Sequence, residues 1–163
     1  MAKKSGKSKK GEKKGGKKGQ KKGAKKGAKK VSLAPTPVKT GKGASVGEVA
    51  SKFVAMFNAQ PGNDKAIWDA LFHKKFTSTE GGMTWHGRKA VQAKGDEFTS
   101  KHDIHSCLCE GPYTGTTGFG VKYTVDMTVK ENGQRMQMTE LAYYKVKNGK
   151  VVEEEFLYGP MPG

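Results

Sequence analysis

The sequence predicts an α+β domain in which a conical, curved antiparallel sheet packs on about three N-terminal helices, preceded by a disordered tail. Three observations predict this arrangement. Apolar residues recur at helical spacing after residue 44, apolar and polar residues alternate with a period of two after Asp103, and lysine and glycine dominate residues 1–43. Helices followed by a run of antiparallel strands are typical of the α+β class.

Charge divides the chain at the same place. The chain of 163 residues has a formal net charge of +16, and residues 1–43 hold 17 lysines and a single acid, Glu12. Residues 44–163 hold 14 basic and 14 acidic residues, so this part of the chain is neutral. We expect a disordered Lys/Gly-rich tail and linker over residues 1–43 and one domain over residues 44–163, and the neutral domain is not expected to bind nucleic acid itself.

The tail repeats a four-residue unit, as in KKGGKKGQKKGAKKGAKK at residues 13–30. It has no large apolar residue to bury between Lys3 and Lys30, and glycine at every fourth position opposes a helix. Paired lysines on a mobile chain can bind nucleic acid or another polyanion through its phosphates. A solubilising extension without a specific partner is the alternative. The expected contact residues are Lys13, Lys14, Lys17, Lys18, Lys21, Lys22, Lys25, Lys26, Lys29 and Lys30.

No secretory signal or membrane span is predicted, because the lysine run is not followed by an apolar stretch of sufficient length. Cys107 and Cys109 are two positions apart on one strand, a poor arrangement for a disulfide, and free thiols suit a reducing compartment. With His105 they form an H-x-C-x-C pattern, but one strand cannot supply four tetrahedral ligands, so no metal and no cofactor is predicted. We expect a cytoplasmic protein, which the tail could bring to the nucleoid or the nucleus.

Three helices are expected before the strands. Ser45 and Glu48 have the spacing of a capping box, and apolar residues follow at helical spacing as far as Phe57. Asn63 is a plausible cap for a second helix, whose apolar side carries Trp68. A third helix is expected over residues 86–101. Its inward residues are predicted to be Ala90, Val91 and Phe98.

Strict alternation marks the strand FGVKYTVDMTVK, which begins at Phe119 and carries its large apolar side chains on one face. The pair Asn132-Gly133 follows and predicts a two-residue hairpin turn. That turn would place Tyr123 opposite Ala142, and Glu140 opposite Val125 on the apolar face.

A second turn, in KVKNGKVV, leaves two registers open. A two-residue loop would put Glu153 and Glu155 on the apolar face, whereas a three-residue loop over residues 147–149 would put Glu154 there instead. The three-residue loop is preferred, because it buries one carboxylate rather than two. In that register the predicted pairs are Glu154 with Ala142 and Glu140 with Phe156.

Four segments together resemble the SnoaL-like branch of the nuclear transport factor 2-like superfamily: WHGRKAV, CEGPYTG, GVKYTVDMTVKENGQRMQMTELAYYKV and NGKVVEEEFLYG. The resemblance spans nearly all of residues 45–160 in the expected order and excludes the tail. It implies a conical α+β barrel with a pocket between the concave sheet and the helices, and a homodimer formed through the sheet. Members include polyketide cyclases, a ketosteroid isomerase, epoxide hydrolases, dehydratases and many pocketed proteins without known activity.

The resemblance also directs attention to acids inside the pocket. Several members end the last strand with an Asp after aromatic residues, but Gly159 stands there in this chain, which disfavours the usual cyclase or isomerase residues. The remaining candidates are Glu140 and Glu154, and two carboxyls close together in an apolar cavity would have their pKa values driven apart. His105 is a third catalytic candidate, as an inward base, because Ile104 takes the other side of its strand.

Aromatic residues are the candidates for ligand contact. Tyr123 and Tyr144 can hydrogen-bond to a carboxylate or to a substrate oxygen, and Trp68, Phe72 and Trp85 could line the wall. Core packing alone would also explain each of them.

Two functions therefore remain open. One is a SnoaL-like ligand-binding or dimerisation module that its tail brings to nucleic acid. The other is an enzyme of isomerase, cyclase, dehydratase or epoxide-hydrolase type, acting through Glu140 and Glu154 on a small apolar molecule that carries oxygen.

Overall fold

The computed structural model describes residues 43–157. The predicted lysine contacts in residues 13–30, and also Tyr158 and Gly159, lie outside the described residues. Among the described helices, none has both the length and the apolar character that a membrane span needs. The described elements are α1 (Val46–Ala59), α2 (Asp64–Leu71), β1 (Phe72–Glu80), β2 (Met83–His86), α3 (Gly87–Lys101), β3 (His102–Thr114), β4 (Gly118–Val129), β5 (Arg135–Lys147) and β6 (Lys150–Leu157).

Side-chain caps begin the first two helices, as predicted. The Ser45 hydroxyl accepts a hydrogen bond from the Glu48 backbone N–H, and the Glu48 carboxylate accepts one from the Ser45 N–H at 2.7 Å. This reciprocal pair is a capping box. At α2, Asn63 Oδ1 accepts from the backbone N–H of Ala66. Both helices then turn their apolar residues toward the sheet.

The third helix is also present where it was predicted, but it buries little. Of its residues only Val91 is fully buried. Phe98 was expected to point inward, yet it is 36% exposed and its ring stacks on His102 with centroids 4.4 Å apart. The helix therefore covers the edge of the core rather than its centre.

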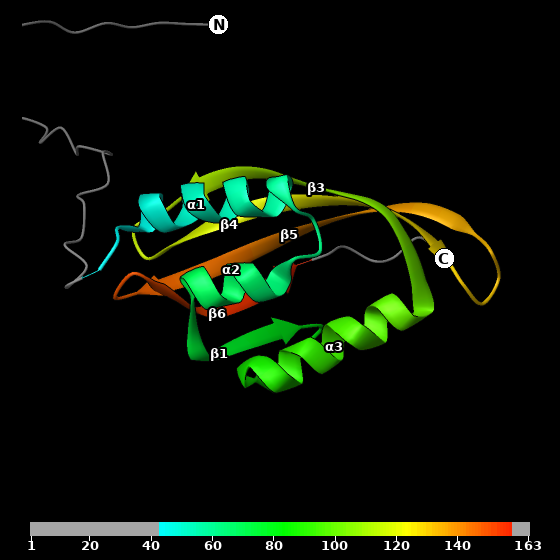
Figure 1. The fold of residues 1–163 in the computed structure, drawn as a ribbon, viewed down its shortest axis with the longest axis horizontal. Coiled ribbons are helices and arrows are strands. Elements are labelled where there is room, and N and C mark those ends of the chain that lie inside the picture. The colour runs from blue at the N-terminus through cyan, green and yellow to red at the C-terminus, as the bar shows by residue number, and fades with distance from the viewer. Residues whose placement is uncertain (1–42, 158–163) are drawn as a thin grey trace, which may run out of the picture. The chain divides into compact units, whose positions relative to one another are not determined.

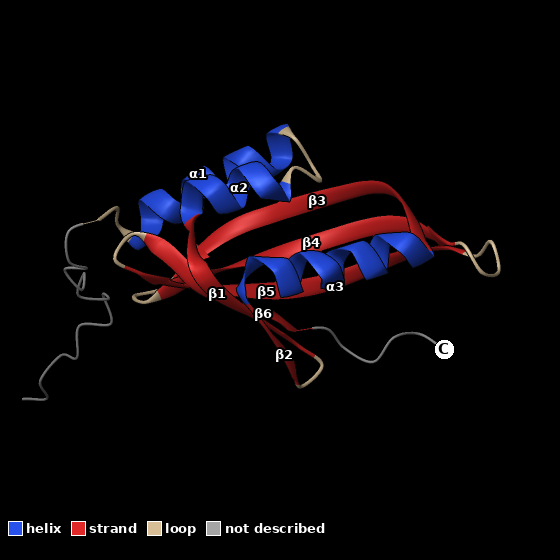
Figure 2. Cartoon of the chain, turned by 60° about the horizontal axis from the view of Figure 1, so that its bottom comes forward, coloured by secondary structure: helices blue, strands red, loops and turns tan. Residues whose placement is uncertain are grey.

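The six strands form one mixed sheet in the order β2-β1-β6-β5-β4-β3. Figures 1 and 2 show the long strands β3, β4 and β5 curving past the helices, which lie against one side of the sheet. The predicted sheet was antiparallel throughout, but β1 and β6 pair in parallel. This is possible because the two strands are joined through the rest of the domain and not by a short turn.

The first hairpin has a wider loop than predicted. Tyr123 pairs with Glu140 and Val125 with Met138, so the register differs by two residues from the expected one. The last paired residues are Thr128 and Arg135, so six residues lie between them, and Val129 closes the loop with two backbone hydrogen bonds, to residues 133 and 134. Because the shift is an even number, the apolar side of the strand is unchanged.

The second hairpin combines a tight turn with a bulge. The loop has two residues, Asn148 and Gly149, both with positive φ, and the prediction of a three-residue loop is wrong. Val151 pairs with Val146, and the register then shifts so that Val152 is an extra residue on β6. The bulge turns Glu154 inward, opposite Tyr144 and not Ala142, while Phe156 pairs with Ala142 and not with Glu140.

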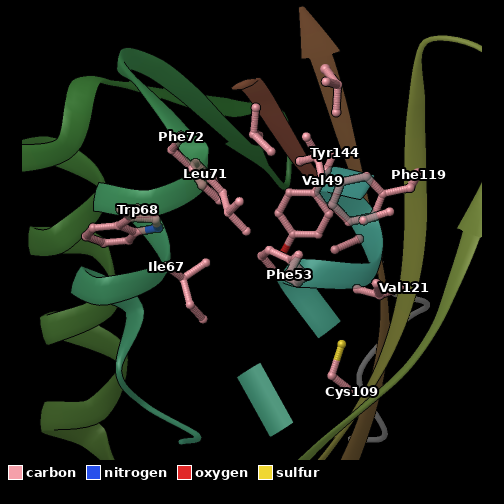
Figure 3. Close-up of a cluster of buried hydrophobic side chains, with 14 of the residues drawn as sticks. Val49, Phe53, Ile67, Trp68, Leu71, Phe72, Cys109, Phe119, Val121 and Tyr144 are labelled. Atoms are coloured by element: carbon pink, nitrogen blue, oxygen red, sulfur yellow. The ribbon is translucent and has the colours of Figure 1, made fainter. Parts of the chain in front are cut away.

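A cluster of aromatic and aliphatic side chains joins the helices to the sheet (Figure 3). Phe53 of α1 lies with its ring centroid 4.6 Å from that of Tyr144 and 5.5 Å from that of Phe119. Asn58 anchors the end of α1 to β3, since its side chain donates to the Cys109 carbonyl at 2.9 Å and accepts from the Cys109 N–H at 3.2 Å. The helices are therefore held against the sheet by apolar packing and by the two hydrogen bonds between the Asn58 side-chain amide and the backbone of β3.

Candidate functional site

A cavity of about 650 Å³ lies between the sheet and the three helices. Its apolar walls come from the helices and the sheet, and its polar groups come from α2, α3 and the strands β3 to β6. The cavity is partly open to solvent. The aromatic lining consists of Phe53, Phe57, Trp68, Phe72, Phe98, Tyr123, Tyr144 and Phe156, and the ionisable groups on its wall include Asp64, Lys94, Glu140 and Glu154.

Glu154 is the more deeply buried of the two candidate carboxyls. It lies on β6 between Tyr144 of β5 and Ser78 of β1, and it is 5% exposed. Burial raises its pKa from 4.5 to about 7, against the hydrogen bond from Ser78 and the charge of Lys94, which lower the pKa. The carboxyl therefore exchanges its proton near neutral pH.

Glu140 reaches the same cavity from β5. It pairs with Tyr123 of β4 and is half-buried. Burial and the charge of Glu80 raise its pKa to about 7, and Lys94 lowers it. The two carboxyls expected from the sequence thus lie on one cavity wall, both poised to hold or release a proton at physiological pH.

Lys94 of α3 is a site residue that the sequence reasoning missed. Its ammonium donates to Glu80 at 2.8 Å and to Ser78 Oγ at 3.0 Å, and it lies 4.3 Å from the ring centroid of Phe156. Only 17% of the side chain is exposed. A signal for this was available, because Lys94 follows the buried Val91 by three positions and so shares its side of the helix.

The two tyrosines bond to each other rather than to a carboxyl. The hydroxyl oxygens of Tyr123 and Tyr144 are 2.7 Å apart, and both residues are buried. Burial raises the pKa of each hydroxyl well above its ordinary value of 10. Both hydroxyls therefore stay protonated, and one hydroxyl proton of the pair remains available to a ligand oxygen or another acceptor.

Comparison with known proteins agrees with this architecture. Residues 44–158 match the SnoaL-like domain family. The chain belongs to this family. A search of functionally curated proteins gives no match.

Solved structures place the SnoaL-like domain in the nuclear transport factor 2-like fold. The similar structures include a candidate SnoaL-like polyketide cyclase from Mesorhizobium loti, which has 28% identity and a TM-score of 0.64 and aligns over 71% of this chain and all of its own. A nuclear transport factor 2-like protein of unknown function from Exiguobacterium sp. 255-15 has 18% identity and a TM-score of 0.54, covering 69% of this chain and 99% of its own. A candidate SnoaL-like cyclase from Jannaschia sp. CCS1 has 13% identity and a TM-score of 0.56, covering 68% and 85%.

The aromatic candidates of the SnoaL-like domain separate into two groups. Trp68 of α2 and Phe72 line the cavity as expected, and Figure 3 shows both on the helical side of the core. Trp85 of β2 is not part of the cavity wall. The centroid of its ring lies 5.2 Å from the Lys94 ammonium, so Trp85 packs beside the ion pair of Lys94 and Glu80.

His105 is among the residues that border the cavity, but its imidazole does not point inward as predicted. A bulge in β3 makes His105 the extra residue between Ile104, paired with Met127, and Ser106, paired with Asp126. The imidazole is exposed, and its Nε2 lies 2.7 Å from Thr128 Oγ1 on the outer face. Strict alternation was the assumption that failed, and one inserted residue reversed the orientation.

The cysteines offer neither a thiolate nor a metal site within residues 43–157. Burial raises the pKa of the Cys107 thiol to about 11 and that of Cys109 to about 12, so both stay protonated at neutral pH. Both are free, and no cluster of three or more potential metal ligands occurs in the described part of the chain. Cys107 contributes only a neutral surface to the cavity wall.

Proposed function

We propose that this SnoaL-like domain binds a small, largely apolar molecule that carries an oxygen acceptor, in the cavity between sheet and helices. The observation that carries the proposal is the pair of carboxyls, Glu140 and Glu154, on a cavity wall rich in aromatic side chains. A carboxyl that holds its proton near pH 7 can donate a hydrogen bond to a ligand oxygen. The volume of about 650 Å³ lies within the range of small-molecule pockets.

Fluorescence titration with 1-naphthol tests this proposal. The probe has an apolar ring system that suits the aromatic side chains of the cavity and one hydroxyl that suits its carboxyls. Val125→Phe places a larger side chain into the cavity from β4 and should abolish binding, whereas Thr124→Phe on the outer side of the same strand should leave it intact. Equal binding by both variants would show that the probe sits elsewhere, and absence of binding to the unmodified chain would count against the proposal.

Acid–base catalysis is a second candidate function. It is favoured by one specific observation, namely that both cavity carboxyls have a pKa of about 7. A group that titrates near the working pH is suited to accept and return protons during turnover. The reaction class would be proton transfer next to a carbonyl group of the bound molecule.

Deuterium exchange provides the measurement. The chain is incubated with 2-tetralone in D₂O, and loss of the α-proton signals is followed by NMR. Glu154→Gln and Glu140→Gln should each reduce the exchange rate at least tenfold, in keeping with the usual contribution of a positioned acid or base. Glu97→Gln, a change on the exposed side of α3, is the control. Exchange that is unchanged in both cavity variants would exclude this role for the carboxyls.

The lysine tail is proposed to bind nucleic acid or another polyanion. The support is compositional, because residues 1–43 carry the charge excess of the whole chain and 10 of their 17 lysines are the paired lysines of residues 13–30. Binding of a random-sequence DNA duplex, measured by fluorescence anisotropy, should weaken steeply with salt and be lost on removal of residues 1–30. Binding that survives the truncation would move the contact to the neutral domain and refute the proposal.

A homodimer through the outer face of the sheet is the remaining proposal. Leu108 of β3, Leu141 of β5 and Leu157 of β6 are each more than half exposed, and Leu141 pairs directly with Leu157 on the adjacent strand. Such a row of exposed leucines favours burial against another surface. Light scattering should give a dimer for the unmodified chain and a monomer for Leu141→Glu, and a monomer in both would exclude the dimer.

A further inference from the structure

Ser78 connects the surface ion pair to the buried carboxyl. It lies on β1 directly beside Glu154 of β6, and its side chain is fully buried. Lys94 Nζ donates to Ser78 Oγ at 3.0 Å. An ammonium has only donors, so the serine oxygen must be the acceptor and its own O–H is free to donate. The carboxyl within reach of that O–H is Glu154.

Glu140 has no matching donor in the described structure. Within residues 43–157, no side chain hydrogen-bonds to its carboxyl, and its neighbour Tyr123 has its hydroxyl bonded to Tyr144. A hydrogen bond donated to a carboxylate favours the ionised form, whereas a carboxyl without donors in apolar surroundings favours the neutral form. The two acids therefore differ in one contact. Glu154 receives a hydrogen bond, which favours the carboxylate of a base, and Glu140 receives none, which favours the protonated carboxyl of an acid.

Two charged groups around the pair act on both carboxyls in the same direction, and a third acts on Glu154 alone. Glu80 on β1 raises both pKa values and Lys94 on α3 lowers both. Asp64 on α2 adds a further raising influence on Glu154, and Glu154 in turn raises the pKa values of the tyrosine hydroxyls. Cys107 of β3 stays protonated beside Glu140. Asp64 and Ser78 act on Glu154 and not on Glu140, and of these two only Ser78 lowers the pKa of Glu154.

We propose that Lys94 and Ser78 are positioning residues that assign the roles of the two carboxyls, with Glu154 as the base and Glu140 as the acid. The inference rests on the proton-transfer function proposed above. Glu154 carboxylate removes the proton from the carbon next to the substrate carbonyl, and the electron pair of that C–H bond forms a C=C bond. Glu140 gives its proton to the carbonyl oxygen, so an enol forms and the single negative charge moves from Glu154 to Glu140. The reverse steps, with the proton returned to carbon, complete an exchange or an isomerisation.

Carbon-13 NMR of labelled glutamate side chains measures the two pKa values directly in the full chain. In the unmodified protein the pKa of Glu154 should lie below that of Glu140. Ser78→Ala should raise the pKa of Glu154 by about one pH unit, the equivalent of one hydrogen bond to a charged group, and leave Glu140 in place. Lys94→Met should raise both pKa values, and Lys94→Arg should restore them because arginine keeps the charge and the donors.

Thr79→Ala is the matched control, since Thr79 is the next residue of β1 and its hydroxyl bonds to Thr84, away from Glu154. An unchanged pKa of Glu154 in Ser78→Ala, or a wild-type order with Glu154 above Glu140, overturns the assignment. If Ser78→Ala does not fold, the order of the two pKa values in the unmodified chain decides the assignment, and the Lys94→Met and Lys94→Arg pair tests only the part played by Lys94. The titration needs no substrate. If the pKa of Glu154 does not shift in Ser78→Ala, the assignment of roles fails, but the proposals of ligand binding and proton exchange are not affected. A correct shift without 2-tetralone exchange instead counts against the proposed reaction and supports the positioning.

Discussion

Replacing Glu154 with glutamine should stabilise the domain at alkaline pH. The folded state holds the pKa of Glu154 at about 7, above the ordinary value of 4.5, because the carboxyl is buried. The folded chain therefore binds more protons than the unfolded chain between pH 4.5 and 7. It follows that the free energy of unfolding falls as pH rises through this window and is constant above it. Glutamine has nearly the same shape, can still accept from Ser78, and carries no charge to desolvate.

The size of the effect follows from the pKa difference. Raising a pKa from 4.5 to about 7 costs the folded state about 3 kcal/mol at pH 8, where the unfolded carboxyl is fully ionised. The gain from Glu154→Gln should approach this value at pH 8 and vanish near pH 4.5. For a domain of this size, about 3 kcal/mol corresponds to a melting temperature higher by roughly 10 °C.

Differential scanning calorimetry at pH 5 and pH 8 is the assay. Glu97→Gln is the control, because Glu97 pairs with Lys101 on the surface and this pairing lowers its pKa. That substitution should have little effect, and any effect should be destabilising at pH 8. The reasoning would be refuted if Glu154→Gln melted below the unmodified chain at pH 8, or if the two differed equally at both pH values.

Three further substitutions test how the fold holds the site. Ser45→Ala removes the capping box with Glu48 and should destabilise the domain by about 1 kcal/mol in urea unfolding. Asn58→Ala removes both hydrogen bonds to the Cys109 backbone and should cost about 1–3 kcal/mol by the same measurement; unchanged stability would mean that water replaces the amide. Gly149→Ala should lower the melting temperature, because φ is +73° there and an added Cβ would lie 2.5 Å from a backbone nitrogen.

The sequence was sufficient for features that depend on local rules. The caps at Ser45 and Asn63 follow from residue spacing alone, and both are present. Alternation along β4 correctly put Tyr123 on the inner side, since no insertion interrupts that strand. Glu140 also reached the predicted wall despite a wrong register, because an error of two residues preserves the side on which each residue lies.

Contacts between segments that are far apart in the sequence could not be predicted from residue spacing. The parallel pairing of β1 with β6 joins residues about 76 positions apart, such as Ser78 and Glu154, and no periodic signal marks it. Helical spacing alone could place Lys94 beside Val91, but it could not give its partners Glu80 and Ser78, which lie on another element. The chemistry of Glu154 depends on these contacts, so the sequence could propose the acid but could not propose what controls its proton.

Two bulges decide which ionisable side chains enter the cavity. In β3 the extra residue is His105, which turns the imidazole out and leaves Ile104 on the inner side. In β6 the extra residue is Val152, which lets Val151 and Glu154 both face inward although strict alternation would separate them. The same device thus turns a candidate base outward on β3 and places one inward on β6, next to Ser78. The pattern of charges in the cavity is therefore set by where the strands depart from regular pairing. Deleting Val152 removes the extra residue and makes the pairing of β6 with β5 regular, so Glu154 should stay opposite Tyr144 and inside the cavity.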